Sequence, residues 1–366
     1  MSLKMGIVGL PNVGKSTLFN ALTRTAAAQA ANFPFCTIEP NIGEVSVPDA
    51  RLDKLAQIAK SAQVIPARMS FVDIAGLVKG ASKGEGLGNQ FLANIRECDA
   101  VLYVLRCFED ANIIHVANKV DPLADAEVVE TELMLADLES LEKRSSGLEK
   151  KAKQGDKDAK QTLELVNAAL ALLRDGKPAR HVKRATPEDE KAFQELQLLT
   201  AKPVLYVCNV SEADAATGNA MTEGVAAYAK THEAGTVIIS AEIESQLAQL
   251  PEEEQREFLE TLGLDEPGLN KLIREGFKLL GLQTYFTAGP KEARAWTIPR
   301  GTKAPQAAGV IHSDFERGFI RAQTIAYDDY VNLGGEVPAK EAGKARDEGK
   351  EYVVKDGDVM LFRFNT

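Results

Sequence analysis

The sequence lacks the features of several protein classes. It has only four cysteines in 366 residues, without CxxC or CxxH spacing, which excludes a disulfide scaffold and predicts no zinc site. No run approaches the roughly 18–20 apolar residues that a membrane span needs, so we expect no membrane partner. The first residues are charged and lead into a strand-like run without a signal-peptide pattern. A cytoplasmic location is the simplest expectation.

Basic residues are fewer than acidic ones: the chain has 43 Lys and Arg and 53 Asp and Glu, which gives a net charge of −10. This balance disfavours wholesale nucleic-acid binding. Residues 143–184 are an exception, with twelve basic and five acidic residues. A basic segment on an acidic chain indicates an arm that contacts RNA or phosphate, although an ordinary solvated helical surface gives the same pattern.

Short apolar runs alternate with helical patterns in the first part of the chain. This alternation predicts an α/β domain with a mostly parallel sheet. Residues 131–200 are instead rich in Glu, Lys, Leu, Ala and Gln, and they predict a helical hairpin or coiled-coil arm inserted into that domain. We expect two helices of roughly 20 residues, each about 30 Å long. An apolar stripe should comprise Leu133, Leu135, Leu138 and Leu141, and Thr186-Pro187 should begin a third helix.

The sequence pattern changes again in the last part of the chain. Short helices are expected over 251–280, and Gly/Pro-punctuated strands follow from Leu282. The expected strands are 284–287, 295–298, 319–324, 352–354 and 359–364. The pattern therefore predicts a nucleotide domain over 1–130 and 201–281, an arm over 131–200, and a small α+β domain over 282–366.

The chemistry begins at residues 9–16, Gly-Leu-Pro-Asn-Val-Gly-Lys-Ser, which match the P-loop pattern GxxxxGK[ST] between a strand and a helix. In this motif backbone N–H groups surround the phosphates, the lysine contacts the β- and γ-phosphates, and the serine hydroxyl binds Mg²⁺. We therefore expect Lys15 to act in catalysis and Ser16 to bind the metal. The phosphate-binding residues should be Asn12, Val13, Gly14, Lys15, Ser16 and Thr17.

A second motif, Asp73-Ile-Ala-Gly76, ends a hydrophobic strand 58 residues after Lys15. In P-loop NTPases this aspartate holds Mg²⁺ and the glycine N–H meets the γ-phosphate. Thr37 lies between the two motifs, where a switch threonine closes over Mg²⁺. The sequence thus predicts a metal site of Ser16, Thr37 and Asp73.

Two motifs compete for recognition of the base. Residues 118–121, Asn-Lys-Val-Asp, match the guanine motif NKxD, but Asn118 follows Asp73 by only 45 residues and a poor strand pattern precedes it. NKxD should end a buried strand two βα units after DxxG, about 60 residues on. The second motif, Asn209-Val-Ser-Glu212, directly follows the apolar run 204–208. Asn209 lies 136 residues after Asp73, or 66 residues when the 70-residue arm is left out.

The second position fits the spacing of a base-binding loop. We expect Asn209 to keep the structural role, Val210 to replace the lysine and Glu212 to replace the aspartate, which places a longer carboxylate where guanine donors would lie. Ser240 and Ala241 follow the next strand and supply the second base-side loop. These features favour ATP over GTP, with GTP as the alternative.

The strings at 9–23, 32–41, 73–97 and 209–212 together resemble the YchF group of Obg-related P-loop proteins, the Obg-like ATPases. The match covers essentially the whole chain. The resemblance implies a C-terminal TGS domain of ubiquitin-like β-grasp type, an ATPase that prefers ATP, association with the ribosome, and a role in translation and stress control. A nucleotide-gated ribosome-binding module with incidental hydrolysis and an Obg-type ribosome-assembly GTPase are the alternatives.

Hydrolysis needs a water molecule aligned on the γ-phosphate. Leu77 stands where Ras-like enzymes have a glutamine, so slow intrinsic turnover is expected. The resemblance implies that His115 substitutes for it, although an ordinary partly exposed histidine is the alternative. Asn12 matches the P-loop asparagine with which related potassium-activated enzymes hold K⁺, and K⁺ is thus a second candidate cofactor beside Mg²⁺.

Overall fold

The computed structural model describes residues 3–30, 41–74, 87–110, 112–113 and 119–365. Contacts divide the chain into two compact units, each formed from two stretches. Unit 1 comprises Leu3–Gly43 and Ser70–Leu272, and unit 2 comprises Glu44–Met69 and Ile273–Thr366. Among the described residues, every helix is too short or too polar to cross a membrane.

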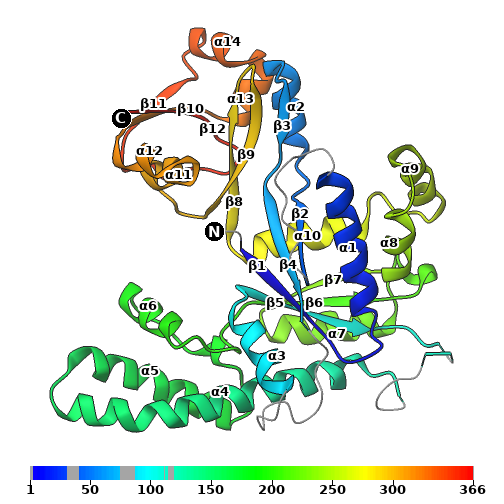
Figure 1. Cartoon of the computed structure of the whole chain (residues 1–366), viewed down its shortest axis with the longest axis vertical. Coiled ribbons are helices and arrows are strands. Elements are labelled where there is room, and N and C mark those ends of the chain that lie inside the picture. The colour runs from blue at the N-terminus through cyan, green and yellow to red at the C-terminus, as the bar shows by residue number, and fades with distance from the viewer. Residues whose placement is uncertain (1–2, 31–40, 75–86, 111, 114–118, 366) are drawn as a thin grey trace. The chain divides into compact units, whose positions relative to one another are not determined.

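The first six-stranded sheet has the order β2-β4-β1-β5-β6-β7 (Figure 1). The last five strands in this order pair in parallel, as the α/β pattern predicts. Their carboxyl ends therefore meet at one edge of the sheet, where P-loop proteins bind nucleotides. The strands are β1 (Lys4–Val8), β2 (Ile42–Ser46), β4 (Arg68–Asp73), β5 (Ala100–Arg106), β6 (Val204–Asn209) and β7 (Gly235–Ile239).

The central strands β5 and β6 are buried at every residue, which explains their continuous apolar sequences. One core joins these strands to α3, α4 and α7, whereas α1 packs against α8. The helices of this α/β part are α1 (Lys15–Ala30), α3 (Leu87–Arg96), α7 (Ala220–Thr231), α8 (Ala241–Leu247) and α9 (Glu252–Thr261). The next helix, α10 (Gly268–Leu279), begins in unit 1, and its residues from Ile273 on belong to unit 2. The short helices expected over 251–280 are thus present.

Glu244 of α8 connects two of these helices. Its carboxylate accepts a hydrogen bond of 2.7 Å from the backbone N–H of Gly268, at the start of α10. The carboxyl group is almost fully buried, and burial raises its pKa to about 7.

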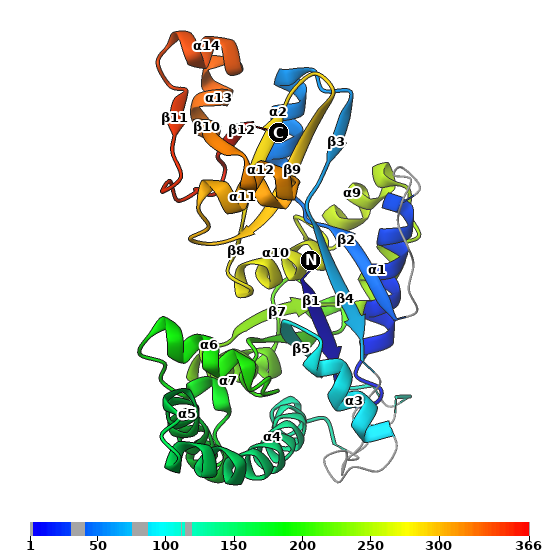
Figure 2. The ribbon, with the colours of Figure 1, turned by 60° about the vertical axis from the view of Figure 1, so that its left-hand side comes forward.

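The inserted arm consists of α4 (Pro122–Lys153), α5 (Lys157–Arg174) and α6 (Pro187–Glu195), with α4 and α5 lying side by side (Figure 2). The expected length of the first helix was wrong. α4 has 32 residues, about 48 Å at 1.5 Å per residue, and it begins before position 131 because Asp121 caps it and Pro122 occupies its first turn. Leu135 is also not part of the apolar stripe, since 46% of its surface is exposed.

Buried polar contacts close the base of the arm. Asp137 of α4 accepts hydrogen bonds from the backbone N–H groups of Leu199 and Thr200, each 2.8 Å, and from the Thr200 hydroxyl at 2.7 Å. Arg180 donates to Glu130 of α4 at 2.8 Å, and both side chains are largely buried. These contacts hold the segment 180–200, which leads back from the arm to β6, against α4.

The second sheet has the order β11-β10-β12-β8-β9-β3, and most of it comes from the C-terminal residues. Its core lies between the sheet and α11, around Tyr285, Ile298 and Phe362. The elements are β3 (Gln63–Ile65), β8 (Leu282–Ala288), β9 (Glu292–Pro299), β10 (Phe319–Ile325), β11 (Arg346–Glu348), β12 (Val359–Phe364), α2 (Ala50–Ala59), α11 (Ala304–Ile311), α12 (Ser313–Arg317), α13 (Tyr327–Leu333) and α14 (Glu336–Glu341).

Two features of this sheet differ from the sequence-based expectation. Residues 352–354 form no strand, because only Val353 makes an isolated bridge, to Lys303. The segment Glu44–Met69, which the sequence pattern assigned to the nucleotide domain, belongs to unit 2. There β3 pairs in parallel with β9, and α2 packs on β8, β9 and α13.

Candidate nucleotide site

The P-loop connects β1 to α1 at the carboxyl edge of the first sheet. Asn12 and Gly14 have positive φ values of 63° and 93°, and the carbonyl of Gly14 accepts from the backbone N–H of Leu18 at 3.0 Å. A side chain at Gly14 would place its Cβ only 2.1 Å from Nδ2 of Asn209. Glycine is therefore required here for both its conformation and the close approach of β6.

Lys15 and Asp73 form an ion pair across this edge. Asp73 ends β4 and is in register with Ile7 of β1, so the sheet positions its carboxylate beside the start of α1. Lys15 is buried, whereas Ser16 next to it is exposed. Three kinds of group therefore lie at this edge of the sheet: the Lys15 ammonium group, which can contact phosphate, the Asp73 carboxylate and the Ser16 hydroxyl.

Asn209 connects three loops at the same edge. Its Nδ2 donates to the carbonyl of Val13 at 2.9 Å, and its Oδ1 accepts from the backbone N–H of Ala241 at 2.9 Å. The residue is buried at the end of β6, where the spacing argument expected a strand to end. Its side chain thus fixes the P-loop relative to the start of α8.

The residues after Asn209 form the rest of the expected base-side surface. Val210 is buried, and its N–H donates to the carbonyl of Ile239 at 2.9 Å. That the Val210 side chain packs beside a base stays a prediction. Glu212 is exposed and accepts from Nε2 of Gln246 at 2.9 Å, and Ser240 caps α8.

The competing motif at 118–121 is placed differently. Asp121 is the N-cap of α4, where its carboxylate accepts from the backbone N–H of Ala124 at 3.2 Å. Lys119 lies 3.9 Å from the same carboxylate. The aspartate therefore has a structural role that does not require a base.

Some expected site residues lie outside the described part of the chain: Thr37, Gly76, Leu77, His115 and Asn118. Thr17 is half-buried in the first turn of α1. Within the described ranges, no group of three or more His, Cys, Asp or Glu side chains is arranged to hold a metal ion.

Sequence reasoning missed Arg106, the last residue of β5. It is in register with Asn209, and only 1% of its surface is exposed. Its guanidinium donates to the carbonyls of Phe108, Asp110 and Ile113 at 2.9–3.2 Å, which fixes the loop after β5. The signal was a charged residue directly at the end of a seven-residue buried strand.

Comparisons with known proteins agree with this architecture. A family model described as "50S ribosome-binding GTPase" matches residues 4–136, and a model for the C-terminal region of YchF GTPases, described as a protein of unknown function, matches residues 282–365. The protein named "Ribosome-binding ATPase YchF" from Escherichia coli O157:H7 is 57% identical over 365 residues and covers 100% of both chains. The chain belongs to the YchF family.

Other YchF proteins match over the same length. The "Ribosome-binding ATPase YchF" of Bacillus subtilis strain 168 is 55% identical over 367 residues, with 100% of each chain covered. The solved structure of the Schizosaccharomyces pombe YchF GTPase has a TM-score of 0.88 and 39% identity, and it covers 99% of this chain and 98% of its own. The fold of this chain is therefore that of YchF proteins over its whole length, and these relatives are called either ATPases or GTPases.

Proposed function

We propose that this YchF-family chain binds ATP at the P-loop and hydrolyses it slowly. Backbone N–H groups of residues 12–17 would surround the phosphates, and Lys15 would contact the β- and γ-phosphates. The ion pair of Lys15 with Asp73 supports this assignment, because it holds the lysine at the carboxyl edge of β1 and β4. Gly76 would donate its N–H to the γ-phosphate.

The preference for ATP rests on the end of β6. Asn209 makes the two hydrogen bonds that fix the P-loop and α8, and Val210 and Glu212 stand where a guanine motif has lysine and aspartate. Gln246 orients the Glu212 carboxylate. The base would therefore lie beside Asn209, Val210 and Glu212, with Ser240 and Ala241 on the opposite loop.

Mg²⁺ fits the donors at this site. Ser16 and Asp73, with Thr37, offer hydroxyl and carboxylate oxygens, the ligands that Mg²⁺ prefers. Because the described residues contain no ready-made group of three ligands of the His, Cys, Asp or Glu type, phosphate oxygens would complete the coordination. When bound, the ion neutralises developing phosphate charge. Asn12 is the residue that we propose for K⁺.

Turnover should be slow because Leu77 cannot orient the attacking water. We assign that task to His115, which follows the loop that Arg106 holds. If the His115→Ala variant still binds ATP and still acts in cells although it no longer hydrolyses ATP, hydrolysis is incidental, and the chain is a nucleotide-gated ribosome-binding module.

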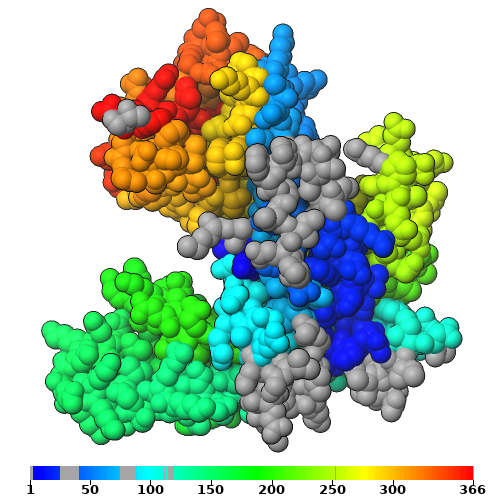
Figure 3. Space-filling view, in the orientation of Figure 1, coloured from blue at the N-terminus to red at the C-terminus, as the bar shows by residue number. Residues whose placement is uncertain are grey.

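The ribosome is the proposed partner, in the cytoplasm, because the relatives from E. coli and B. subtilis are named ribosome-binding ATPases. The basic arm supports contact with RNA. Its tip exposes a lysine cluster in which no ammonium group has a carboxylate partner among the described residues. Figure 3 shows the surface of the α4–α5 hairpin. The tip cluster comprises Lys150, Lys151, Lys153, Lys157 and Lys160.

Side-by-side equilibrium binding of ATP and GTP with Mg²⁺ tests the nucleotide assignment. We expect tighter binding of ATP, lost in Lys15→Ala and retained in Lys54→Ala, an exposed lysine of α2. Val210→Lys with Glu212→Asp, which restores the NKxD residues, should shift the preference toward GTP. A preference for GTP in the unaltered chain would support the ribosome-assembly GTPase instead.

A second experiment separates the ATPase from the binding module. His115→Ala should bind ATP normally and lose turnover, and ribosome binding that still responds to ATP would favour the module. Reversal of Lys150, Lys151 and Lys153 to glutamate should weaken ribosome co-sedimentation and reduce its salt dependence. Reversal of the exposed Lys271, Lys350 and Lys355 is the matched control. Equal effects of the two triple variants would remove the arm from the proposal.

A further inference from the structure

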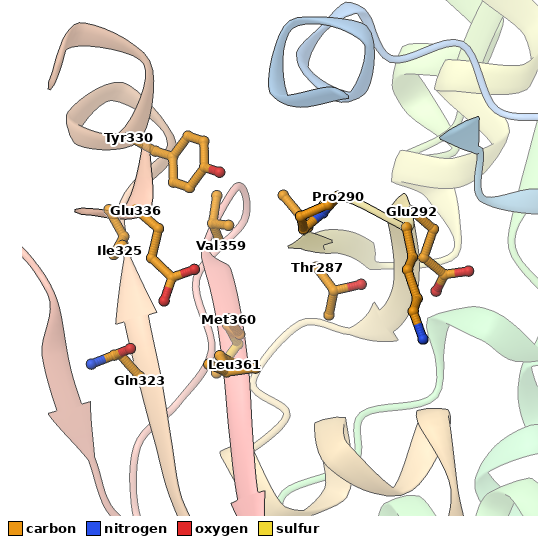
Figure 4. Close-up of a pocket in the computed structure, with 13 residues that line it drawn as sticks. Thr287, Pro290, Glu292, Gln323, Ile325, Tyr330, Glu336, Val359, Met360 and Leu361 are labelled. Carbon is orange, nitrogen blue, oxygen red and sulfur yellow. The ribbon is translucent and has the colours of Figure 1, made fainter. Parts of the chain in front are cut away.

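The C-terminal sheet contains a cavity of about 510 Å³ that the nucleotide chemistry does not use (Figure 4). It opens because β8 and β12 pair through a single residue pair, Phe286 with Val359, and then diverge. Thr287 and Pro290 of the β8–β9 hairpin lie on one side, and Met360 and Leu361 of β12 lie on the other. The volume is within the range of small-molecule sites, about 300–1,000 Å³.

The walls are mainly apolar. Ile325, Val359 and Met360 are buried, and Leu361 keeps 41% of its surface exposed at the cavity. An exposed leucine beside buried branched residues leaves apolar surface in water, which a ligand with an apolar body would cover.

Tyr330 directs a polar group into this space. Tyr330 of α13 is only 3% exposed, and Figure 4 shows its hydroxyl directed from α13 toward Pro290. The hydroxyl makes no hydrogen bond to another described residue, whereas the hydroxyl of Tyr285 in β8 donates to the carbonyl of Ala307 at 2.8 Å. A tyrosine hydroxyl is protonated at neutral pH and can donate, and burial raises the pKa of Tyr330 further.

Charged groups of both signs stand at the cavity. Lys291 and Glu292 are adjacent on the hairpin, and Glu336 pairs with Lys340 of the same helix. An ion would lose hydration and would meet charges of both signs, so the surroundings favour a neutral ligand over an anion or a cation.

We propose that this cavity binds a small neutral molecule with an apolar body and a carbonyl or amide oxygen that accepts a hydrogen bond from Tyr330. The apolar body contacts Ile325, Val359 and Leu361. The site lies within unit 2 and does not depend on the proposed ATPase activity.

Ligand-observed NMR titrations of the full chain with three matched probes test the proposal. The probes are benzamide, benzoate and benzylamine, which share a ring and differ in charge. We expect saturable binding of benzamide and weaker binding of both ions. Tyr330→Phe removes one hydrogen bond and should weaken benzamide binding about 3- to 10-fold. Tyr327→Phe on the same helix does not line the cavity and is the control.

Two further variants complete the design. Leu361→Trp should fill the cavity and abolish benzamide binding, and Lys15→Ala should leave it unchanged, which excludes binding at the P-loop. Three results would each overturn the proposal: no saturable benzamide signal, equal affinities in Tyr330→Phe and the unaltered chain, or tighter binding of either ion. Circular dichroism spectra of each variant establish that lost binding does not reflect unfolding.

Discussion

The contact between Gly14 and Asn209 makes a quantitative prediction about the nucleotide site. Asn209→Ala removes two buried hydrogen bonds and leaves the carbonyl of Val13 and the N–H of Ala241 without their partner. At about 1–3 kcal/mol for each buried group left unsatisfied, the free energy of unfolding should fall by about 2–6 kcal/mol. ATP affinity should fall as well, because the P-loop and α8 lose their connection.

Gly14→Ala should destabilise the chain for two reasons. A φ of 93° is strained for alanine, and the new Cβ would lie 2.1 Å from Nδ2 of Asn209, a side chain held at both ends. In the double variant, Gly14→Ala with Asn209→Ala, the clash with the Asn209 side chain disappears and only the backbone strain at position 14 remains. The combined loss should therefore be smaller than the sum of the single losses by about 1–3 kcal/mol.

Urea unfolding of the four proteins, followed by circular dichroism, measures this coupling. Gly14→Ala with Asn219→Ala is the matched control, since Asn219 is also a hydrogen-bonded asparagine but caps α7 and does not approach Gly14. The control pair should be additive within about 0.5 kcal/mol. Additivity in the Gly14 and Asn209 pair would refute the assigned contact.

Three further changes test other parts of unit 1. Asp137→Ala should reduce the free energy of unfolding by about 3–9 kcal/mol in urea titrations, because three buried donors lose their acceptor at about 1–3 kcal/mol each, whereas Glu139→Ala on the exposed face should change it by less than about 0.5 kcal/mol. Because the folded pKa of Glu244 is raised from 4.5 to about 7, the folded state binds its proton more tightly, and stability should fall by about 3 kcal/mol as pH rises through that window. Glu244→Gln should flatten this pH dependence of the urea midpoint, and an unchanged slope would show that other groups cause it. Asp121→Ala should cost about 1 kcal/mol of helix capping and leave the ratio of ATP to GTP affinities unchanged, and an altered ratio would return residues 118–121 to the base site.

Local patterns predicted most of the first unit because its signals are local. The run 204–208 is apolar at every position, and β6 covers it and ends at Asn209, as the spacing argument required. Thr186 and Asp189 form the capping box that starts α6. The start of α4 was missed because the arm was assigned from the composition of residues 131–200, whereas Asp121 caps the helix before that composition begins.

The remaining differences arise from contacts between residues far apart in the chain. β3 has three residues and pairs with β9, so no local pattern assigns it to the second sheet. The ion pair of Lys15 with Asp73 agrees with the expected meeting of the P-loop and the DxxG motif. The role of Arg106 was not predicted because a single arginine after an apolar run is not part of a known motif. Its role also depends on the carbonyls of a loop that has no regular sequence pattern.

The split composition of unit 2 affects the order in which the chain can fold during synthesis. β3 leaves the ribosome about 230 residues before its partner β9. At about 5–20 residues per second, that interval lasts about 10 to 45 s. Throughout it, Leu52 and Leu55 of α2, which are buried in the finished protein, have no sheet to cover them. The nascent chain therefore carries the apolar face of this segment uncovered for most of its own translation, and early termination would release it in that state.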